Sequence, residues 1–252
     1  MLELKVLTYR SLGTALVTIY VGKKPTQFVI HKKLLCDTTD FFLKAFSGSF
    51  KESEGIMHLP EEHPGAFALF VEWLYRSRVT HVNTVRHWIN LFNLYIFAEK
   101  LCLNELANRT IDRIRHMEAW SPIAIVTLAL TSYVYKKTFT DSPLREYCVA
   151  ALVYDLSSKD KHVPADDRLK QMWKYCRDDS DLFVDYFRYL REHEGKVIKT
   201  PAKNEKDYDS EMSECKFHRH AKDEECYLCS PDIDFSPTPS ETNIEDIENF
   251  SE

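Results

Sequence analysis

Within the segment from Leu16 to Val79, the spacing of apolar residues changes from that of a β-strand to that of an α-helix. This change limits the folds that the chain can adopt. From Ala15 to Val21, apolar side chains alternate between two faces, which is typical of a strand. Turn residues follow from Gly22 to Pro25, and the segment from Gln27 to His31 returns as a second strand. We therefore expect a β-hairpin at the start of the ordered part of the chain.

Helical spacing takes over after the hairpin. We expect two short helices over residues 31–35 and 41–46, with Thr39 or Asp40 as the N-cap of the second. A short strand over residues 56–59 precedes a helix that begins near Pro64, where a first turn tolerates proline. The buried stripe of that helix has the spacing i, i+3, i+4, i+7: Phe67, Phe70, Val71 and Leu74. Strands followed by helices predict an α+β fold, a small sheet covered by helices.

From Ser121 onward the spacing predicts helices alone. Cap-and-proline pairs at Ser121-Pro122 and Ser142-Pro143 mark two helix starts. The last helical face predicted is formed by Phe183, Tyr186, Phe187 and Leu190.

The composition changes at Gly195, where lysine, acidic residues, serine and proline begin to dominate. Few apolar groups remain there to offset the entropy of ordering, so we expect a mostly disordered, acidic tail. The predicted organisation is an N-terminal segment (1–14), an α+β domain (15–117), an all-helical extension (118–194) and the tail (195–252).

The first domain carries an ordered set of anchors: the hairpin, His31-x-x-Leu34-Leu35, Phe41-Phe42, Phe50-Lys51-Glu52-Ser53, a strand ending in Leu59-Pro60, and an aromatic helix ending in Leu74-Tyr75. This set, over about the first 117 residues, resembles the BTB/POZ family, most closely its fungal branch. The resemblance implies a BTB/POZ fold and a scaffold or adaptor that binds other proteins, with self-association as a further expectation. It also implies a structural role for His31, which lies where it can satisfy backbone groups at a helix start.

The triplet Phe50-Lys51-Glu52 admits two interpretations. In BTB adaptors for cullin-type ubiquitin ligases, a hydrophobic-x-Glu triplet at this place helps contact the cullin, so the resemblance implies partner-binding roles for Phe50 and Glu52. The alternative is that Phe50 closes the domain core. The first interpretation would make the chain a substrate-receptor subunit of a cullin-type ligase. Such a subunit also needs a module that binds the substrate. Residues 120–194 and the tail are the only candidates for it, which argues against this interpretation.

Cysteine and histidine gather in the tail in the order Cys215, His218, Cys226, Cys229, with His220 as an alternative ligand. Paired ligands two residues apart allow one backbone turn to present both to a metal, and sulfur with imidazole favours zinc. Metal binding would order a tail that has no core, because binding and folding are linked. The competing interpretations are incidental residues in a disordered segment and redox-sensitive thiols.

Composition argues against other classes of function. The net charge of −6 disfavours nucleic-acid binding, and it weakens a third hypothesis, a transcription-linked factor with a zinc-binding tail. The most apolar run, over residues 123–134, is too short to span a bilayer, so we expect no membrane partner. The first residues lack the apolar core of a leader, which favours the cytoplasm or nucleus. Cys36 near His31 has no third orienting group, and we predict that the protein is not an enzyme.

Overall fold

The computed structural model describes residues 12–80, 84–120, 126–157, 165–202, 215–220 and 226. Strands and short helices come first: β1 (Leu16–Val21), β2 (Thr26–His31), α2 (Lys32–Thr38), α3 (Asp40–Ser47), the 3-10 turn η1 (Lys51–Glu54) and β3 (Ile56–Leu59). Longer helices follow: α4 (Pro64–Arg76), α5 (Val85–Lys100), α6 (Asn104–Trp120), α7 (Leu128–Lys137), α8 (Pro143–Ser157), α9 (Ala165–Asp178) and α10 (Ser180–Glu192). The predicted α+β fold, a small sheet with helices, is confirmed.

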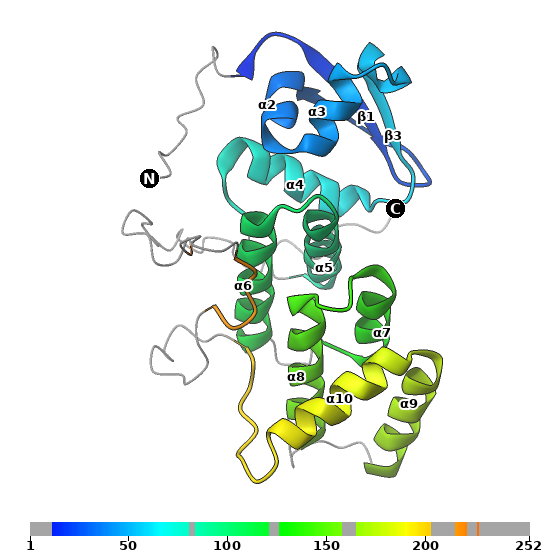
Figure 1. Ribbon diagram of the computed structural model, residues 1–252, viewed down its shortest axis with the longest axis vertical. Coiled ribbons are helices and arrows are strands. Elements are labelled where there is room, and N and C mark those ends of the chain that lie inside the picture. The colour runs from blue at the N-terminus through cyan, green and yellow to red at the C-terminus, as the bar shows by residue number, and fades with distance from the viewer. Residues whose placement is uncertain are drawn as a thin grey trace, which may run out of the picture. The chain divides into compact units, whose positions relative to one another are not determined.

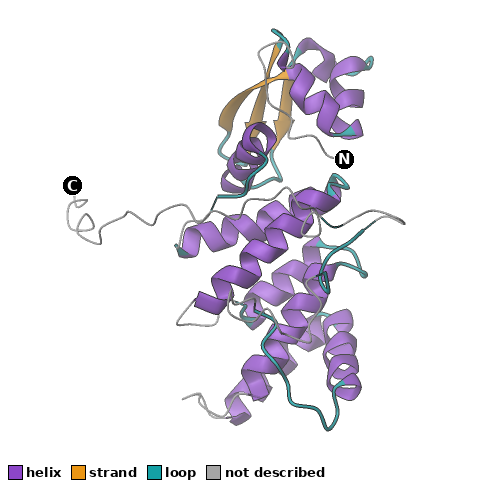
Figure 2. Cartoon of the chain, turned by 90° about the vertical axis from the view of Figure 1, so that its left-hand side faces the viewer, coloured by secondary structure: helices purple, strands orange, loops and turns teal. Residues whose placement is uncertain are grey.

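The three strands form one sheet in the order β2-β1-β3, in which β1 pairs antiparallel with β2 and parallel with β3. Alternation along the strands turns one face inward, and its side chains are buried: Val17, Ile19, Val21, Ile30 and Met57. Figure 2 shows helices beside the sheet, and none of the helices described lies over its other face. Gly22 ends the first strand with φ +89°, and a Cβ there would come within 2.8 Å of the Pro64 ring, so the hairpin turn needs glycine.

Helices α2 and α3 meet at Thr39, whose hydroxyl accepts a 3.2 Å hydrogen bond from the Phe42 backbone N–H. This is the N-cap predicted from the sequence. The cap directs Phe42 and Phe46 inward, where they are buried. Phe42 then stacks on Phe70 of α4, with the ring centroids 6.0 Å apart, and Phe70 meets Phe97 of α5 edge-on at 5.3 Å. Aromatic packing therefore joins α3, α4 and α5 (Figure 1).

His31 joins the end of β2 to α4 and does not cap a helix. It precedes α2 but makes no side-chain cap hydrogen bond. Its Nδ1 lies 2.7 Å from the Tyr75 hydroxyl, and its backbone N–H donates to the same hydroxyl at 3.2 Å. The role is structural, as the family resemblance implies, but the partner is a side chain 44 residues along the chain.

The helical extension continues the core of the first domain, and buried residues of α4 through α8 belong to one apolar cluster. Its first described helix, α7, begins at Leu128 with the Thr127 hydroxyl as its cap. The start predicted at Ser121-Pro122 lies outside the described residues, whereas the start predicted at Ser142-Pro143 is observed in α8. Helix α9 was not predicted as a separate element.

The face predicted for the last helix is partly wrong. Helix α10 buries Leu182 and Tyr189, whereas Phe183 and Phe187 are exposed at 40% and 52%. The predicted stripe is offset because α10 packs against α8 and α9 along the side that carries Leu182. Phe183 and Phe187 contact each other instead, with ring centroids 4.6 Å apart.

A buried guanidinium fastens α7 to α8. Arg145 is 6% exposed, and its Nη2 donates to the carbonyls of Tyr135 and Thr138, each at 2.6 Å. These carbonyls lie at the end of α7, where helix carbonyls have no partner within the helix. A cation at that end also complements the helix dipole.

Two described parts of the predicted tail, around Pro201 and Phe217, pack against the helices. Phe217 has no exposed surface and lies edge-on to Tyr147 of α8, with the ring centroids 5.4 Å apart. Arg115 of α6 donates from Nε to the carbonyl of the buried Pro201 at 3.1 Å. Residues 203–214, 221–225 and 227–252 lie outside the described part of the chain, so disorder there stays a prediction. Among the helices described, none has both the length and the apolar character needed to cross a bilayer.

Replacing Tyr75 by phenylalanine tests the bond between β2 and α4. Tyr75→Phe leaves the His31 N–H and ring without their partner, so we expect the free energy of unfolding to fall by about 1–2 kcal/mol. Chemical denaturation measures this, with Tyr154→Phe, an exposed tyrosine on α8, as the matched control. Equal losses for the two variants would contradict the assigned role.

Phe217→Ala tests whether residues 215–219 are part of the fold. We call these residues, together with His220 and Cys226, the tail segment. Removing a fully buried phenylalanine creates a cavity beside Tyr147, so we expect a loss of about 3 kcal/mol of unfolding free energy. Phe187→Ala removes an exposed ring and serves as the control, for which we expect a much smaller loss. A Phe217→Ala protein as stable as the wild type in denaturant would show that residues 215–219 do not pack there in solution.

Candidate functional site

Three large apolar side chains on α3 and the turn after it are exposed. Phe41 and Leu43 flank the buried Phe42 on α3 and are 45% and 44% exposed, and Phe50 is 61% exposed. We call these three residues, together with Glu52, the α3 surface. Large exposed apolar side chains mark a partner-binding surface where they form one continuous patch.

Phe50 lies at the head of η1 and does not close the core, as the alternative interpretation required. The Glu52 carbonyl accepts a 2.9 Å hydrogen bond from the Gly55 backbone N–H, and Gly55 ends the turn with φ +91°. Gly48 lies under the Phe50 ring, because a Cβ there would be 3.1 Å from a ring carbon and 2.6 Å from the Lys44 carbonyl oxygen. The local sequence therefore holds Phe50 outward on a tight turn.

A second exposed apolar group lies on the uncovered face of the sheet. Thr18 pairs with Val29 on one side and with Ile56 on the other, so the three side chains form a row across the strands. Val29 and Ile56 are 54% and 50% exposed, and Leu16 beside them is 55% exposed. We call this row the sheet face.

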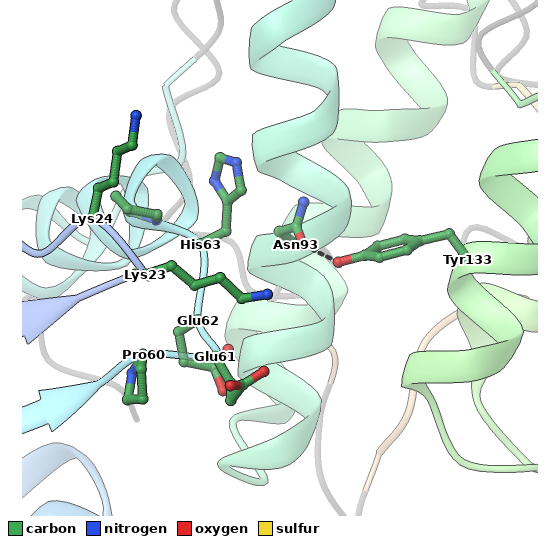
Figure 3. A pocket seen from close by; sticks show the side chains of 10 residues that line it. Lys23, Lys24, Pro60, Glu61, Glu62, His63, Asn93 and Tyr133 are labelled. Carbon is green, nitrogen blue, oxygen red and sulfur yellow. Dashed lines mark hydrogen bonds between the residues drawn. The ribbon is translucent and has the colours of Figure 1, made fainter.

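A polar hollow of about 340 Å³ lies between the hairpin turn, the start of α4 and α7. Figure 3 shows Lys23 and Lys24 on the hairpin side and Asn93 with Tyr133 on the other. The Tyr133 hydroxyl donates to Asn93 Oδ1 at 2.6 Å. Glu62, also on the lining, forms an ion pair with Lys100 at 2.9 Å. Opposite charges are therefore mixed along the lining of this hollow. The residues that line it do not place a nucleophile beside a base.

Cys36 and His31 do not form a reactive pair. The Cys36 thiol lies 3.7 Å from the Phe42 carbonyl, to which it donates, and the His31 ring is engaged by Tyr75. Burial raises the pKa of the Cys36 thiol, which favours the unreactive protonated form.

Four candidate metal ligands of the tail segment gather at one point. The ligand atoms of Cys215, His218, His220 and Cys226 all lie within 4.8 Å of one another. Three of these residues belong to the ligand set predicted from the sequence, and His220 is the predicted alternative. Cys229, the fourth member of that set, lies outside the described residues.

The polar face of α6 holds this segment. The His218 side chain is fully buried, and its Nε2 lies 3.0 Å from a carboxylate oxygen of Asp112. Asp112 is in turn paired with Arg115 at 3.2 Å, and the Arg115 guanidinium lies 5.2 Å from the centre of the Phe217 ring. A continuous set of charged and aromatic contacts therefore connects α6 to the residues on either side of Phe217.

The side chain of Asn108 on α6 binds the backbone of Arg219 through two hydrogen bonds. The Arg219 N–H donates to Asn108 Oδ1 at 2.9 Å, and Asn108 Nδ2 donates back to the Arg219 carbonyl at 3.0 Å. The Arg219 guanidinium lies 3.4 Å from Glu99 and 3.5 Å from Asp141. Burial raises the pKa of the Glu99 carboxyl, and the Arg219 charge opposes that rise.

Sequence reasoning did not find Asn108, Asp112 or Arg115 as partners of the tail. On α6 they recur at intervals of three and four residues, which places them on one helix face. Because α6 also has an apolar face, a polar stripe on the same helix looks like ordinary solvated surface until the segment that packs on it is known. The available signal in the tail was Phe217, a large apolar residue enclosed by candidate metal ligands.

Comparison of the sequence with models of known families matches residues 14–117 to the BTB/POZ domain. No curated protein matches the chain. The matched range contains the three-stranded sheet and the helices from α2 through most of α6. It therefore covers the α3 surface and the sheet face but not the helical extension or the tail. Residues 14–117 of this chain are a BTB/POZ domain, a module of protein–protein interaction.

Proposed function

We propose that this chain is a docking protein that binds a protein partner through the α3 surface of its BTB/POZ domain. The observation that carries the proposal is the 61% exposure of Phe50, with Phe41 and Leu43 also outward. Exposing three such side chains to water is unfavourable, and covering them with a partner recovers that free energy. Aromatic residues are also enriched among those that dominate binding energy at interfaces.

The rest of the domain supports a rigid platform under this surface. Phe42 and Phe46 alternate with the exposed residues of α3 and are buried against α4. A helix anchored on one side loses little conformational freedom when a partner covers the other side, which favours binding. We place the protein in the cytoplasm or nucleus and within the fungal branch of the family, both as expectations from its sequence.

A second, narrower candidate is a substrate-receptor subunit of a cullin-type ubiquitin ligase. It is favoured by the outward position of Phe50 with Glu52 two residues on, at the head of an ordered turn. In this interpretation the helical extension and the tail would have to bind the substrate. The protein would then contribute to ubiquitin transfer without performing chemistry itself.

Substitution within the α3 surface tests the cullin interpretation. We expect Phe50→Ala to weaken binding to a purified cullin N-terminal region at least tenfold, because truncating an aromatic hot spot costs about 2 kcal/mol or more. Glu52→Ala is expected to weaken the same binding by removing a carboxylate contact. Phe139→Ala is the matched control, because Phe139 is 58% exposed but lies in the helical extension. Biolayer interferometry measures the affinities. Absence of binding by the wild type would remove the ligase candidate.

The broader docking proposal has its own test. A photoreactive amino acid is placed at position 41 or 43, and the same group at position 139 is the control. In host cells we expect one defined protein to be cross-linked from positions 41 and 43 and not from 139. Identical cross-linked products from all three positions would contradict docking on the α3 surface, whatever the result with a cullin.

Self-association is assigned to the sheet face, where Val29 and Ile56 flank Thr18. We expect the wild-type protein to be a dimer at micromolar concentration and the double variant Val29→Lys, Ile56→Lys to be monomeric. Size-exclusion chromatography with light scattering measures the masses. The exposed substitution Phe139→Lys controls for added charge, and a wild-type protein that is monomeric at high concentration would refute the assignment.

A further inference from the structure

We infer that Cys215, His218, His220 and Cys226 bind one Zn²⁺ ion, and that Asp112 of α6 orients His218 for this role. All four ligand atoms lie within 4.8 Å of one another. A tetrahedral zinc ion with Zn–S near 2.3 Å and Zn–N near 2.0 Å holds its ligand atoms roughly 3.3–3.8 Å apart. The side chains are therefore within about 1 Å of the spacing that the ion requires.

The first two ligands come from one closed turn. The His218 backbone N–H donates to the Cys215 carbonyl at 2.9 Å, so residues 215–218 form a hydrogen-bonded turn. Phe217, inside the turn, is fully buried against Tyr147 and fixes its position. This is the way in which ligands two residues apart reach one metal in structural zinc sites.

The second two ligands follow within the same short stretch of chain, in the order Cys-x2-His-x-His-x5-Cys. Cys226 is buried at 6% exposure, and the side chain of His218 is fully buried. Two thiolates neutralise the charge of the ion, so a partly buried Cys2His2 site carries no net charge. Four closed ligands of this kind are typical of a structural zinc site and not of a catalytic one.

Asp112 provides the contact that such a histidine needs. His218 Nε2 lies 3.0 Å from the Asp112 carboxylate, and a proton on Nε2 would be donated to that oxygen. The lone pair is then on Nδ1, which leaves that nitrogen to bind the metal. Carboxylates that hold the second nitrogen of a ligating histidine raise its basicity and fix its orientation. Asp112 is a positioning residue, and through His218 it would connect the ion to the polar face of α6.

The full-length protein, purified with a phosphine reductant, is used to test the site. We expect about one equivalent of zinc after dialysis, measured by mass spectrometry of the metal, as for a structural site. Replacement by Co²⁺ is expected to give the visible and thiolate charge-transfer bands of a tetrahedral site. A zinc-free protein that takes up neither metal would overturn the proposal.

Variants distinguish this ligand set from one in which Cys229 replaces His220. Cys215→Ser, His220→Ala and Cys226→Ser are expected to lose most of the bound metal and the cobalt bands, whereas Cys229→Ser and Cys102→Ser retain both. Cys102 is exposed and outside the cluster, which makes it the matched thiol control. Metal loss in Cys229→Ser with retention in His220→Ala would overturn the proposed set. Circular dichroism of each variant identifies any loss that arises from unfolding.

Asp112→Asn tests the orienting contact with all four ligands intact. We expect zinc affinity to fall about 10–100-fold while the metal-free protein keeps its helical spectrum. Glu105→Gln, which removes an acidic partner of Arg109 on the same helix, is the control and is expected to leave affinity unchanged. An Asp112→Asn protein with wild-type zinc affinity would refute the role of Asp112.

Proteolysis tests the fastening of the tail. Trypsin cleavage after Lys216 and Arg219 is expected to accelerate at least tenfold when a chelator removes zinc. In Cys226→Ser the cleavage should be fast with or without the chelator. Equal rates for the wild type in the two conditions would show that the metal does not hold this segment.

Discussion

The structure depends on the packing of a few aromatic rings between the sheet and the longer helices. Phe70 of α4 contacts Phe42 of α3, Phe67 within its own helix and Phe97 of α5. Phe42, Phe67 and Phe70 are almost completely buried. One side chain therefore connects the helices that cover the sheet to α5, and a cavity at this point would loosen several elements at once.

The same packing determines which residues remain for function. Since α3 commits Phe42 and Phe46 to the core, its other positions must face outward, and Phe41 and Leu43 are among them. The uncovered face of the sheet arises in the same way, because alternation buries Val17 and Ile19 and leaves Leu16, Val29 and Ile56 exposed. The domain thus leaves apolar side chains exposed on α3 and on the sheet, whereas the polar hollow beside the hairpin turn is lined by mixed charges.

Long-range polar contacts give the tail segment an ordered place in the fold. Arg115, Asp112 and Asn108 line one side of α6, and each contacts a tail residue that lies 86–111 positions further along the chain. Buried charges of this kind are tolerated because each has partners, since an isolated one would be costly. The contact with Asp112 places His218 beside α6, so this helix holds one ligand of the candidate metal site.

Much of the BTB/POZ domain could be predicted from the sequence because its signals are local. The strand alternation, the Thr39 cap and the proline at the start of α4 each depend on neighbours a few residues away. Prediction was poorer where packing between distant elements decides the outcome. The exposed faces of α10 and the Tyr75 partner of His31 are examples, since periodicity identifies an apolar stripe but not the surface that covers it.

The sequence by itself determined the element types, the α+β class, the set of anchors that matches the BTB/POZ domain and the presence of a Cys/His cluster. Only the tertiary structure decided that Phe50 faces outward, that His220 joins the cluster and that Asp112 meets His218 across 106 residues. The reason is physical. Local hydrogen bonding and side-chain periodicity are written in adjacent residues, whereas a contact between distant segments exists only once the chain has reversed and packed.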